Sequence, residues 1–250
     1  MAKMNMIAAL NSALDLQLQR DPNVVIFGED VGYFGGVFRV TAGLQEAHGA
    51  HRVFDSPLAE GGIAAVAFGM GINGLRPVME IQFADYIFPA YDQIVNEMAK
   101  LRHRSGGEFW TPVTIRTPAG GGIKGGHHHS QSPEAQFTHT PGLKVVYCSN
   151  PYNAKGLLTS AIECNDPVVF FEPKRCYRGP FYGDPHKVPT WNSHPDGEVP
   201  EEYYSIPLEQ ARVVKEGSAC TVIAWGTMVH VAEEGIRHSC IDAELIDLQT

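Results

Sequence analysis

The sequence is poor in cysteine, and the cysteines that it has form no motif. There are five, an odd number, scattered without a CxxC pair: Cys148, Cys164, Cys176, Cys220 and Cys240. This distribution argues against a disulfide framework and a cysteine-bound zinc site, and it fits reduced thiols in a cytosolic compartment. Residues 1–22 lack the apolar core of a targeting peptide and have the pattern of an amphipathic helix. We therefore expect a cytoplasmic protein of bacterial type.

Long apolar runs and basic clusters are also missing. No stretch approaches the ~18 apolar residues of a membrane span, and no lysine or arginine run supplies the positive surface that nucleic acid needs. The formal net charge is −9, from 19 basic and 28 acidic residues. We expect neither a membrane nor a nucleic acid as partner. A content of 44% hydrophobic and 19% charged residues is typical of a globular chain with a substantial core.

Strand-like and helix-like segments alternate along the chain. Apolar residues at helical spacing predict a first helix that begins near Met6 and stops at Asp21. Strand-like runs lie within 23–32, 52–62, 76–86, 111–118, 142–149 and 166–173, and helical patterns lie within 61–75, 91–106 and 153–165. This alternation predicts an α/β fold around a mostly parallel sheet that is flanked by helices.

The composition divides the chain into three parts. Residues 1–172 form the α/β domain, and residues 173–207, rich in proline and aromatic residues, have little periodicity and are interpreted as a linker. Residues 208–250 begin a second α/β unit, with a strand, a glycine turn, a helix and a strand in that order. One such unit cannot bury both faces of its sheet, so we expect this C-terminal domain to be incomplete.

The stretch "GGGIKGGHHHSQSPEAQ", residues 120–136, holds the most unusual cluster of residues. It has no Gly-Lys-Ser/Thr of a phosphate-binding loop, and no helical pattern follows that would aim a helix N-terminus at a phosphate. His127 and His129 are two residues apart, unlike the helical spacing of a zinc protease motif. A solvated flexible loop remains one interpretation. The other is a loop that orders over a ligand and brings a near-neutral proton carrier to it.

Two glutamates follow neighbouring strand-like runs. Glu29 lies in "FGEDVG" and Glu60 in "SPLAEGG". Ligands of open α/β sheets bind beyond the carboxyl ends of the strands, so both glutamates and the histidine loop are expected at one end of the sheet. By itself, Glu60 is equally consistent with a helix-start residue that the helix dipole favours.

Four longer segments make the pattern specific. They are "GEDVGYFGGVFRVTAGL", "RVFDSPLAEGGIAAVAFGMGINGLRPVMEIQFADYIFPAYDQIVNEMAK", "GGHHHSQSPEAQFTHTPGLKVV" and "NAKGLLTSAIECNDPVVFFEPK". In sequence and order they resemble the β subunits of the thiamine diphosphate-dependent 2-oxo acid dehydrogenases. The "HSQSPEA" and "FFEPK" motifs are most similar to the branched-chain (2-oxoisovalerate) enzyme, with the pyruvate or acetoin enzyme as the alternative.

The resemblance implies a transketolase-like pyrimidine-binding domain followed by the start of a transketolase C-terminal-like domain. It also implies an α2β2 heterotetramer that carries thiamine diphosphate at the α–β interface. Mg2+ would be held by the α subunit, since this chain has no GDG motif, and the chain would be active only with that subunit. The implied reaction is oxidative decarboxylation of branched-chain 2-oxo acids, with reductive acylation of the lipoyl group of a dihydrolipoyl acyltransferase.

Five positions match residues that the family places around the pyrimidine half of the cofactor. Glu60 matches the glutamate that hydrogen-bonds the aminopyrimidine ring and exchanges a proton with it. Leu58, Gln82 and Tyr86 match positions that line or contact the ring, although ordinary packing would also explain them. Glu29 matches a carboxylate on a polar path between the two active sites.

His129 matches the histidine of the family's "HSQ" motif. The resemblance implies a place near the reacting carbon, with a role in proton transfer or in stabilising the intermediate during reductive acylation. His127 and His128 would shape the loop. Two readings from other classes are a metal-dependent hydrolase built on the histidines and a non-catalytic interaction module; the presence of both Glu60 and His129 disfavours the second.

A monovalent cation, usually potassium, is bound in the family through backbone carbonyls near the turn "AIECNDP". Ala161, Cys164 and Asp166 match those positions. A plain turn at the C-terminus of a helix, ending at Pro167, explains the same residues.

Overall fold

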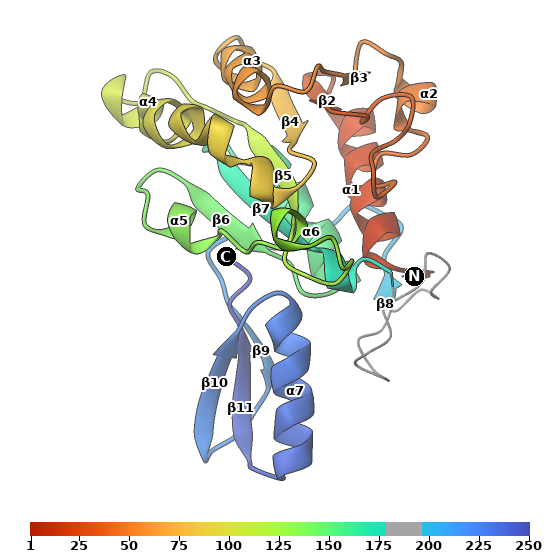
Figure 1. The fold of residues 1–250 in the computed structure, drawn as a ribbon, viewed down its shortest axis with the longest axis vertical. Coiled ribbons are helices and arrows are strands. Elements are labelled where there is room, and N and C mark those ends of the chain that lie inside the picture. The colour runs from red at the N-terminus through yellow and green to blue at the C-terminus, as the bar shows by residue number, and fades with distance from the viewer. Residues whose placement is uncertain (179–196) are drawn as a thin grey trace.

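The structure is a computed structural model that describes residues 1–178 and 197–250. Its centre is a six-stranded parallel sheet in the order β3-β2-β4-β5-β7-β6 (Figure 1). The strands are β2 (Val24–Gly28), β3 (Val53–Asp55), β4 (Arg76–Glu80), β5 (Thr114–Ala119), β6 (Lys144–Tyr147) and β7 (Val168–Pro173). This arrangement confirms the predicted α/β fold with a parallel sheet.

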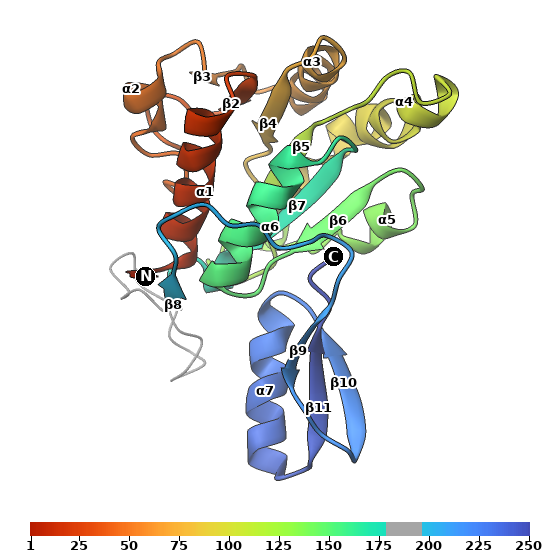
Figure 2. The same cartoon turned by 180° about the vertical axis from the view of Figure 1, so that it is seen from behind.

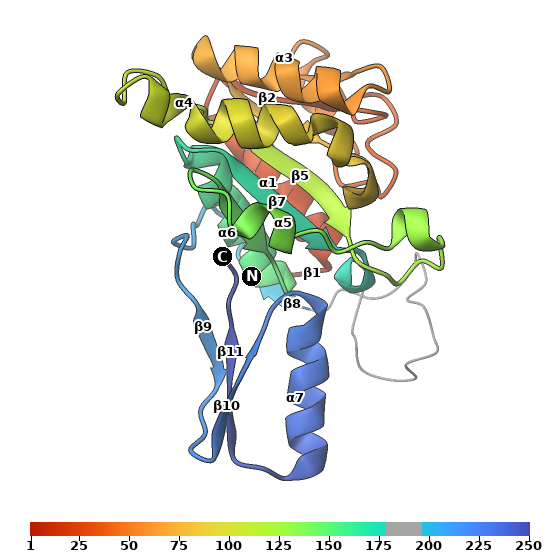
Figure 3. The ribbon, with the colours of Figure 1, turned by 60° about the vertical axis from the view of Figure 1, so that its left-hand side comes forward.

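Helices cover both faces of this sheet, which is why its strands are buried throughout. Helices α1 (Met6–Arg20) and α6 (Pro151–Glu163) pack together on one face. On the other face lie α3 (Glu60–Ile72) and α4 (Ala99–Arg104) (Figure 3). The remaining short helices are α2 (Leu44–His48) and α5 (Ala135–Thr138). Each strand sends alternate side chains into the two cores, as Ile26 and Phe27 of β2 do.

Local signals in the sequence account for the ends of the long helices. The side chain of Asn5 accepts a hydrogen bond from the N–H of Ala8 at 2.9 Å, a cap worth about 1 kcal/mol, and α1 ends just before Asp21, as predicted. Helix α6 begins with a reciprocal pair of hydrogen bonds between Asn150 and Asn153. These caps fix where the helices leave the sheet.

One predicted element was wrong in extent. The strand predicted within 76–86 ends at Glu80, because its partner β2 ends at Gly28, and the chain then turns through the 3-10 helix η1 (Ala84–Tyr86). The helix predicted within 91–106 is confirmed, since residues 91–104 are helical throughout. A 3-10 turn, η2 (Phe88–Ala90), precedes it, and its middle is a π-helical segment, η3 (Gln93–Met98), that continues into α4.

The described parts of the predicted linker 173–207 contain regular structure. A 3-10 turn, η5 (Lys174–Cys176), follows β7, and β8 (Gly197–Val199) pairs antiparallel with β1 (Ala2–Met4). The chain then runs across α6 (Figure 2), where the ammonium of Lys155 donates to the carbonyls of Pro200 and Glu201. The domain boundaries stay a prediction.

The C-terminal unit has the predicted strand–helix–strand order and one additional strand. Strand β10 (Cys220–Ala224), helix α7 (Thr227–Ser239) and β11 (Ala243–Asp247) form the unit, and β9 (Arg212–Lys215) pairs antiparallel with β11. The carboxylate of Asp247 accepts from the hydroxyl of Ser149 at 2.6 Å, which ties this unit to the main sheet.

A buried ion network lies at the centre of the large sheet. On β5, Arg116 donates two hydrogen bonds to Glu172 of β7, at 2.7 and 2.9 Å, and one to Glu80 of β4, at 2.9 Å. Tyr177 donates to Glu172 at 2.6 Å. Burial raises the pKa of Glu80, and Arg116 opposes that rise. One guanidinium therefore compensates two carboxylates that have little access to water.

Replacing Arg116 should destabilise the chain strongly. The change Arg116→Met keeps the side-chain volume but leaves Glu80 and Glu172 uncompensated, and we expect a loss of about 3–5 kcal/mol in the free energy of unfolding. Urea denaturation measures it. The control Arg104→Met removes a half-exposed pair with Glu97 and should cost less than about 1 kcal/mol. Equal losses in the two variants would contradict this account.

Candidate functional site

The side chains singled out in the sequence gather where four neighbouring strands end. Glu29 directly follows β2, and Glu60 follows β3 at the start of α3. Gln82 and Tyr86 follow β4, and His129 follows β5. These strands are consecutive in the order β3-β2-β4-β5. The expectation that both glutamates and the histidine loop lie at one end of the sheet is therefore confirmed.

Glu29 and Glu60 form an acidic pair. Glu29 is 9% exposed, and its Oε1 has no hydrogen-bond partner among the described residues. Burial raises the pKa of Glu29, and the negative charges of Glu60 and Asp30 raise it further. Glu60 is half-buried and is the first residue of α3, which confirms its position at a helix start, and its role as a site residue stays a prediction. The pair can hold a proton that another group donates or receives.

Gln82 and Tyr86 are placed by the irregular segment after β4. The amide of Gln82 donates to the carboxylate of Asp30 at 3.3 Å, next to the acidic pair. Tyr86 turns toward the histidine loop, where its hydroxyl lies 3.4 Å from Nε2 of His129. The segment from Gln82 to Tyr86 thus connects the glutamates with the histidine. A shared pocket for the two side chains stays a prediction.

His129 is the last residue of the 3-10 turn η4 (His127–His129). Its Nδ1 lies 3.1 Å from the carbonyl oxygen of Gly125. A carbonyl only accepts, so Nδ1 carries the hydrogen of the neutral ring, and Nε2 is left as an acceptor for the hydroxyl of Tyr86. The ring of Phe83 packs edge-on to His129 with the centroids 4.5 Å apart. His127 and His128 are exposed, in keeping with a role limited to the shape of the loop.

Apolar side chains beside the site are open to solvent. Leu58 is 79% exposed, and Tyr33 and Phe34 in the loop after Glu29 are 92% and 52% exposed. Such large apolar groups at a cluster of polar residues mark a surface that a ligand or another chain covers.

The positions matched to a potassium site lie elsewhere. Ala161 is in the last turn of α6, and Cys164 and Asp166 lie between α6 and β7, at the end of the sheet opposite to His129. The guanidinium of Arg76 donates to the carbonyls of Ile162 and Cys164 at 3.1 and 3.2 Å, so a positive charge already faces this turn. The potassium site stays a prediction.

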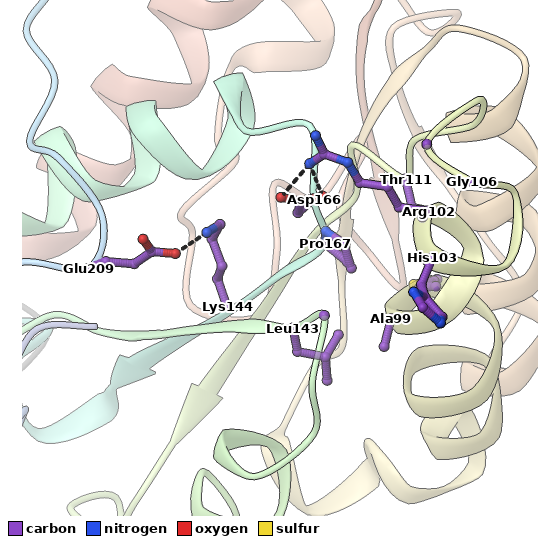
Figure 4. Close-up of a pocket in the computed structure, with 13 residues that line it drawn as sticks. Ala99, Arg102, His103, Gly106, Thr111, Leu143, Lys144, Asp166, Pro167 and Glu209 are labelled. Carbon is purple, nitrogen blue, oxygen red and sulfur yellow. Dashed lines mark hydrogen bonds and ion pairs between the residues drawn. The ribbon is translucent and has the colours of Figure 1, made fainter.

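A cavity of 580 Å³ opens beside the same turn (Figure 4). Its charged side chains are already paired with each other. Arg102 binds both oxygens of Asp166, at 2.7 and 2.9 Å, and Lys144 pairs with Glu209. Within residues 1–178 and 197–250, no group of three or more histidine, cysteine, aspartate or glutamate side chains could hold a metal ion.

Several buried polar residues of the site were missed from the sequence. Asp85 and Lys174 are 7% and 5% exposed, and both lie close to the histidine loop. Glu134, just after this loop, accepts a hydrogen bond from the indole N–H of Trp225 at 3.1 Å. A charged residue inside the apolar run "FADYIF" was the one available signal for Asp85.

Comparisons with known proteins agree with this geometry. The family described as "Transketolase, pyrimidine binding domain" matches residues 2–180. The "2-oxoisovalerate dehydrogenase subunit beta" of Pseudomonas aeruginosa is 56% identical over 248 residues, which are 99% of this chain and 71% of that protein. The "Pyruvate dehydrogenase E1 component subunit beta" of Acholeplasma laidlawii is 47% identical over 253 residues, covering 100% of this chain and 73% of that protein.

A solved structure described as "Split gene transketolase, inactive beta4 tetramer" has the same fold. Its TM-score is 0.71 at 19% identity, and the match covers 98% of this chain and 71% of that one. The fold and the site thus define a thiamine diphosphate-type, transketolase-like pyrimidine-binding protein. Within this class, the chain belongs to the family of 2-oxo acid dehydrogenase β subunits. Among the residues that the structure describes, no helix has both the length and the apolar character needed to cross a membrane.

The pH dependence of stability tests the environment of Glu29. Its pKa is raised in the folded chain, so the folded state holds the proton more tightly than the unfolded state, whose glutamate pKa is near 4.3. Wild-type stability therefore falls, relative to Glu29→Gln, as the pH rises from about 4.3 through the raised pKa. Each tenfold difference in proton affinity corresponds to about 1.4 kcal/mol.

We expect Glu29→Gln to be more stable than wild type at pH 8 and equal to it near pH 4. Urea denaturation at the two pH values checks this. The matched control is Glu108→Gln, at an exposed glutamate, which should show no such pH-dependent gain. A Glu29→Gln chain that is less stable than wild type at pH 8 would overturn the assignment.

Proposed function

We propose that this chain provides the acid–base half of the active site of a dehydrogenase for branched-chain 2-oxo acids, with 2-oxoisovalerate as the substrate. One observation carries the proposal: an acidic pair and a histidine whose Nε2 is an acceptor facing Tyr86 lie at adjacent strand ends, on a face with exposed apolar side chains. The greater identity to a 2-oxoisovalerate subunit, 56% against 47% for a pyruvate subunit, favours the branched-chain substrate.

The residues at the strand ends fit the pyrimidine half of thiamine diphosphate. Oε1 of Glu29 is a buried acceptor without a partner among the described residues, and Glu60 and Gln82 lie beside it with polar atoms open to a ligand. Glu60 would hold a proton at its carboxylate against the aminopyrimidine ring, and Leu58 and Tyr86 would bound that ring. When bound, thiamine diphosphate supplies the carbanion stabilisation that decarboxylation of a 2-oxo acid requires.

His129 is suited to proton transfer at a defined atom. With Nδ1–H donated to the carbonyl of Gly125, Nε2 is the atom that can receive a proton or, once protonated, donate a hydrogen bond to developing negative charge. Tyr86 orients that nitrogen. The glycines of residues 120–126 give the segment the freedom to admit the lipoyl group of an acyltransferase, whose reductive acylation His129 would assist.

The exposed apolar groups need a partner chain. An α subunit covering Leu58, Tyr33 and Phe34 would close the site and exclude water, which strengthens the electrostatic interactions inside it. We propose an α2β2 assembly in which the α subunit holds Mg2+ and the diphosphate, since this chain offers no GDG motif for them. The chain would then be active only with that subunit.

The substrate preference is the first quantity to measure. With the α partner, thiamine diphosphate and Mg2+, we expect decarboxylation of 3-methyl-2-oxobutanoate to exceed that of pyruvate by at least about tenfold in kcat/KM, since apolar pockets separate substrates that differ by one methylene by ~1–3 kcal/mol. An artificial electron acceptor reports turnover. A preference for pyruvate, or for acetoin, would assign the chain to one of those alternatives.

Substitutions at the two acid–base residues should separate their roles. Glu60→Gln should lower kcat by about 10²–10⁴-fold with any acceptor, because proton exchange with the cofactor ring is lost. His129→Ala should impair transfer to the lipoyl group more than turnover with the artificial acceptor. His128→Ala, which alters an exposed neighbour, is the control and should stay close to wild type. Unchanged acyl transfer in His129→Ala would remove the role assigned to this histidine.

A further inference from the structure

Asp85 connects the body of the domain to the segment that carries His129. It lies in η1, is 7% exposed, and its Oδ1 accepts the backbone N–H groups of Ser130 and Gln131 at 3.1 and 3.2 Å. Hydrogen bonds to an ionised carboxylate are about twice as strong as neutral ones. Two consecutive amides on one oxygen fix the direction in which the chain leaves the turn.

The other hydrogen bonds near His129 are mostly internal to its own loop. Nδ1 of His129 and the hydroxyl of Ser130 bond to the carbonyls of Gly125 and Gly126, at 3.1 and 2.6 Å. Such bonds shape the loop but do not hold it to the sheet. The contact of His129 with Tyr86 is long, at 3.4 Å. Among the described residues, the carboxylate of Asp85 is therefore the strongest polar attachment between this turn and the segment after β4.

Lys174 is a buried cation that interacts electrostatically with this carboxylate. Its ammonium donates to the carbonyl of Pro118 at 3.4 Å and lies 5.6 Å from the centroid of the Phe83 ring, which packs edge-on to His129. Burial lowers the pKa of Lys174 to about 8, and the charge of Asp85 acts against that decrease. Oδ2 of Asp85 is buried and has no hydrogen-bond partner among the described residues. A nearby cation makes such a buried, charge-bearing atom without a hydrogen bond tolerable in the interior.

We propose that Asp85 is a positioning residue, which clamps the His129 segment so that Nε2 faces Tyr86, and that Lys174 supplies the cation which compensates its buried charge. The importance of this clamp for turnover rests on the function proposed above. The clamp itself is a property of the folded chain and is open to a test that does not depend on activity.

Amide hydrogen exchange of Ser130 and Gln131 tests the clamp directly, in the full chain assembled with its α partner. In Asp85→Ala we expect both amides to exchange at least about tenfold faster than in wild type, because both lose their acceptor. Asp85→Asn keeps an acceptor oxygen without the charge and should give a smaller increase. The matched control is Asp92→Asn, whose exposed carboxylate accepts a hydrogen bond from Asn96 one helical turn away, and it should leave both amides unchanged.

Lys174→Met tests the second part, since it removes the charge and keeps the apolar stem. We expect faster exchange of the same two amides, and an effect in the Asp85→Asn/Lys174→Met double variant that is smaller than the product of the two single effects. Multiplicative effects would show that the two residues act independently and would overturn the role of Lys174. If Asp85→Ala does not fold, Asp85→Asn and Lys174→Met still decide the question.

Kinetics distinguish failure of the clamp from failure of the proposed function. Asp85→Asn should lower kcat for lipoyl acylation several-fold and leave KM for the 2-oxo acid within about twofold, because a misplaced histidine affects turnover more than binding. A wild-type complex without turnover would reject the proposed function, while the exchange result would still stand. Unchanged exchange of Ser130 and Gln131 in Asp85→Ala would reject the clamp, whatever the activity.

Discussion

The position of the site depends on one buried charge, the guanidinium of Arg116. It joins the three adjacent strands β4, β5 and β7 through Glu80 and Glu172. Each of these strands continues, within a few residues, into a segment that carries site residues. A charged residue in the middle of a parallel sheet has no access to water, so opposite charges on the neighbouring strands must lie level with it to compensate its charge. The ion network thus fixes the relative positions of the loops that bring the histidine and the glutamine to the site.

The site is built on rigid strand ends but completed by softer elements. Glu29 and Glu60 stand directly on the sheet and on the first turn of α3, whereas His129 stands on a glycine-rich turn that the rest of the domain must hold. This division suits the proposed reaction, in which the glutamates exchange a proton at a fixed place and His129 acts on the lipoyl group, which moves. It also fits the proposed α subunit, which would cover apolar side chains such as Leu58 that lie exposed next to polar ones.

Much of this arrangement could be predicted from the sequence, because its signals are local. A strand end marked by a glycine and an acidic residue, as at Glu29, can be recognised from a few consecutive residues. The same is true of the "HSQ" motif around His129. Asp85 and Lys174 could not be found in this way. Asp85 lies in a run that has the alternation of a strand, and Lys174 lies in a stretch that resembles a linker. Their burial follows from where β4 and β7 end, and strand pairing between distant segments decides that.

The packing of α1 on α6 has a consequence for how the chain is made. The apolar face of α1 is covered by a helix that begins at Pro151, and Gln17 donates to Glu163 at 2.8 Å. At synthesis rates of roughly 5–20 residues per second, α1 waits on the order of ten seconds before α6 leaves the ribosome. The apolar face of α1 is thus covered only after a much later segment has been made. Until then, an apolar face that includes Leu10 and Leu14 must be kept from other chains, and a chaperone would find its binding surface there.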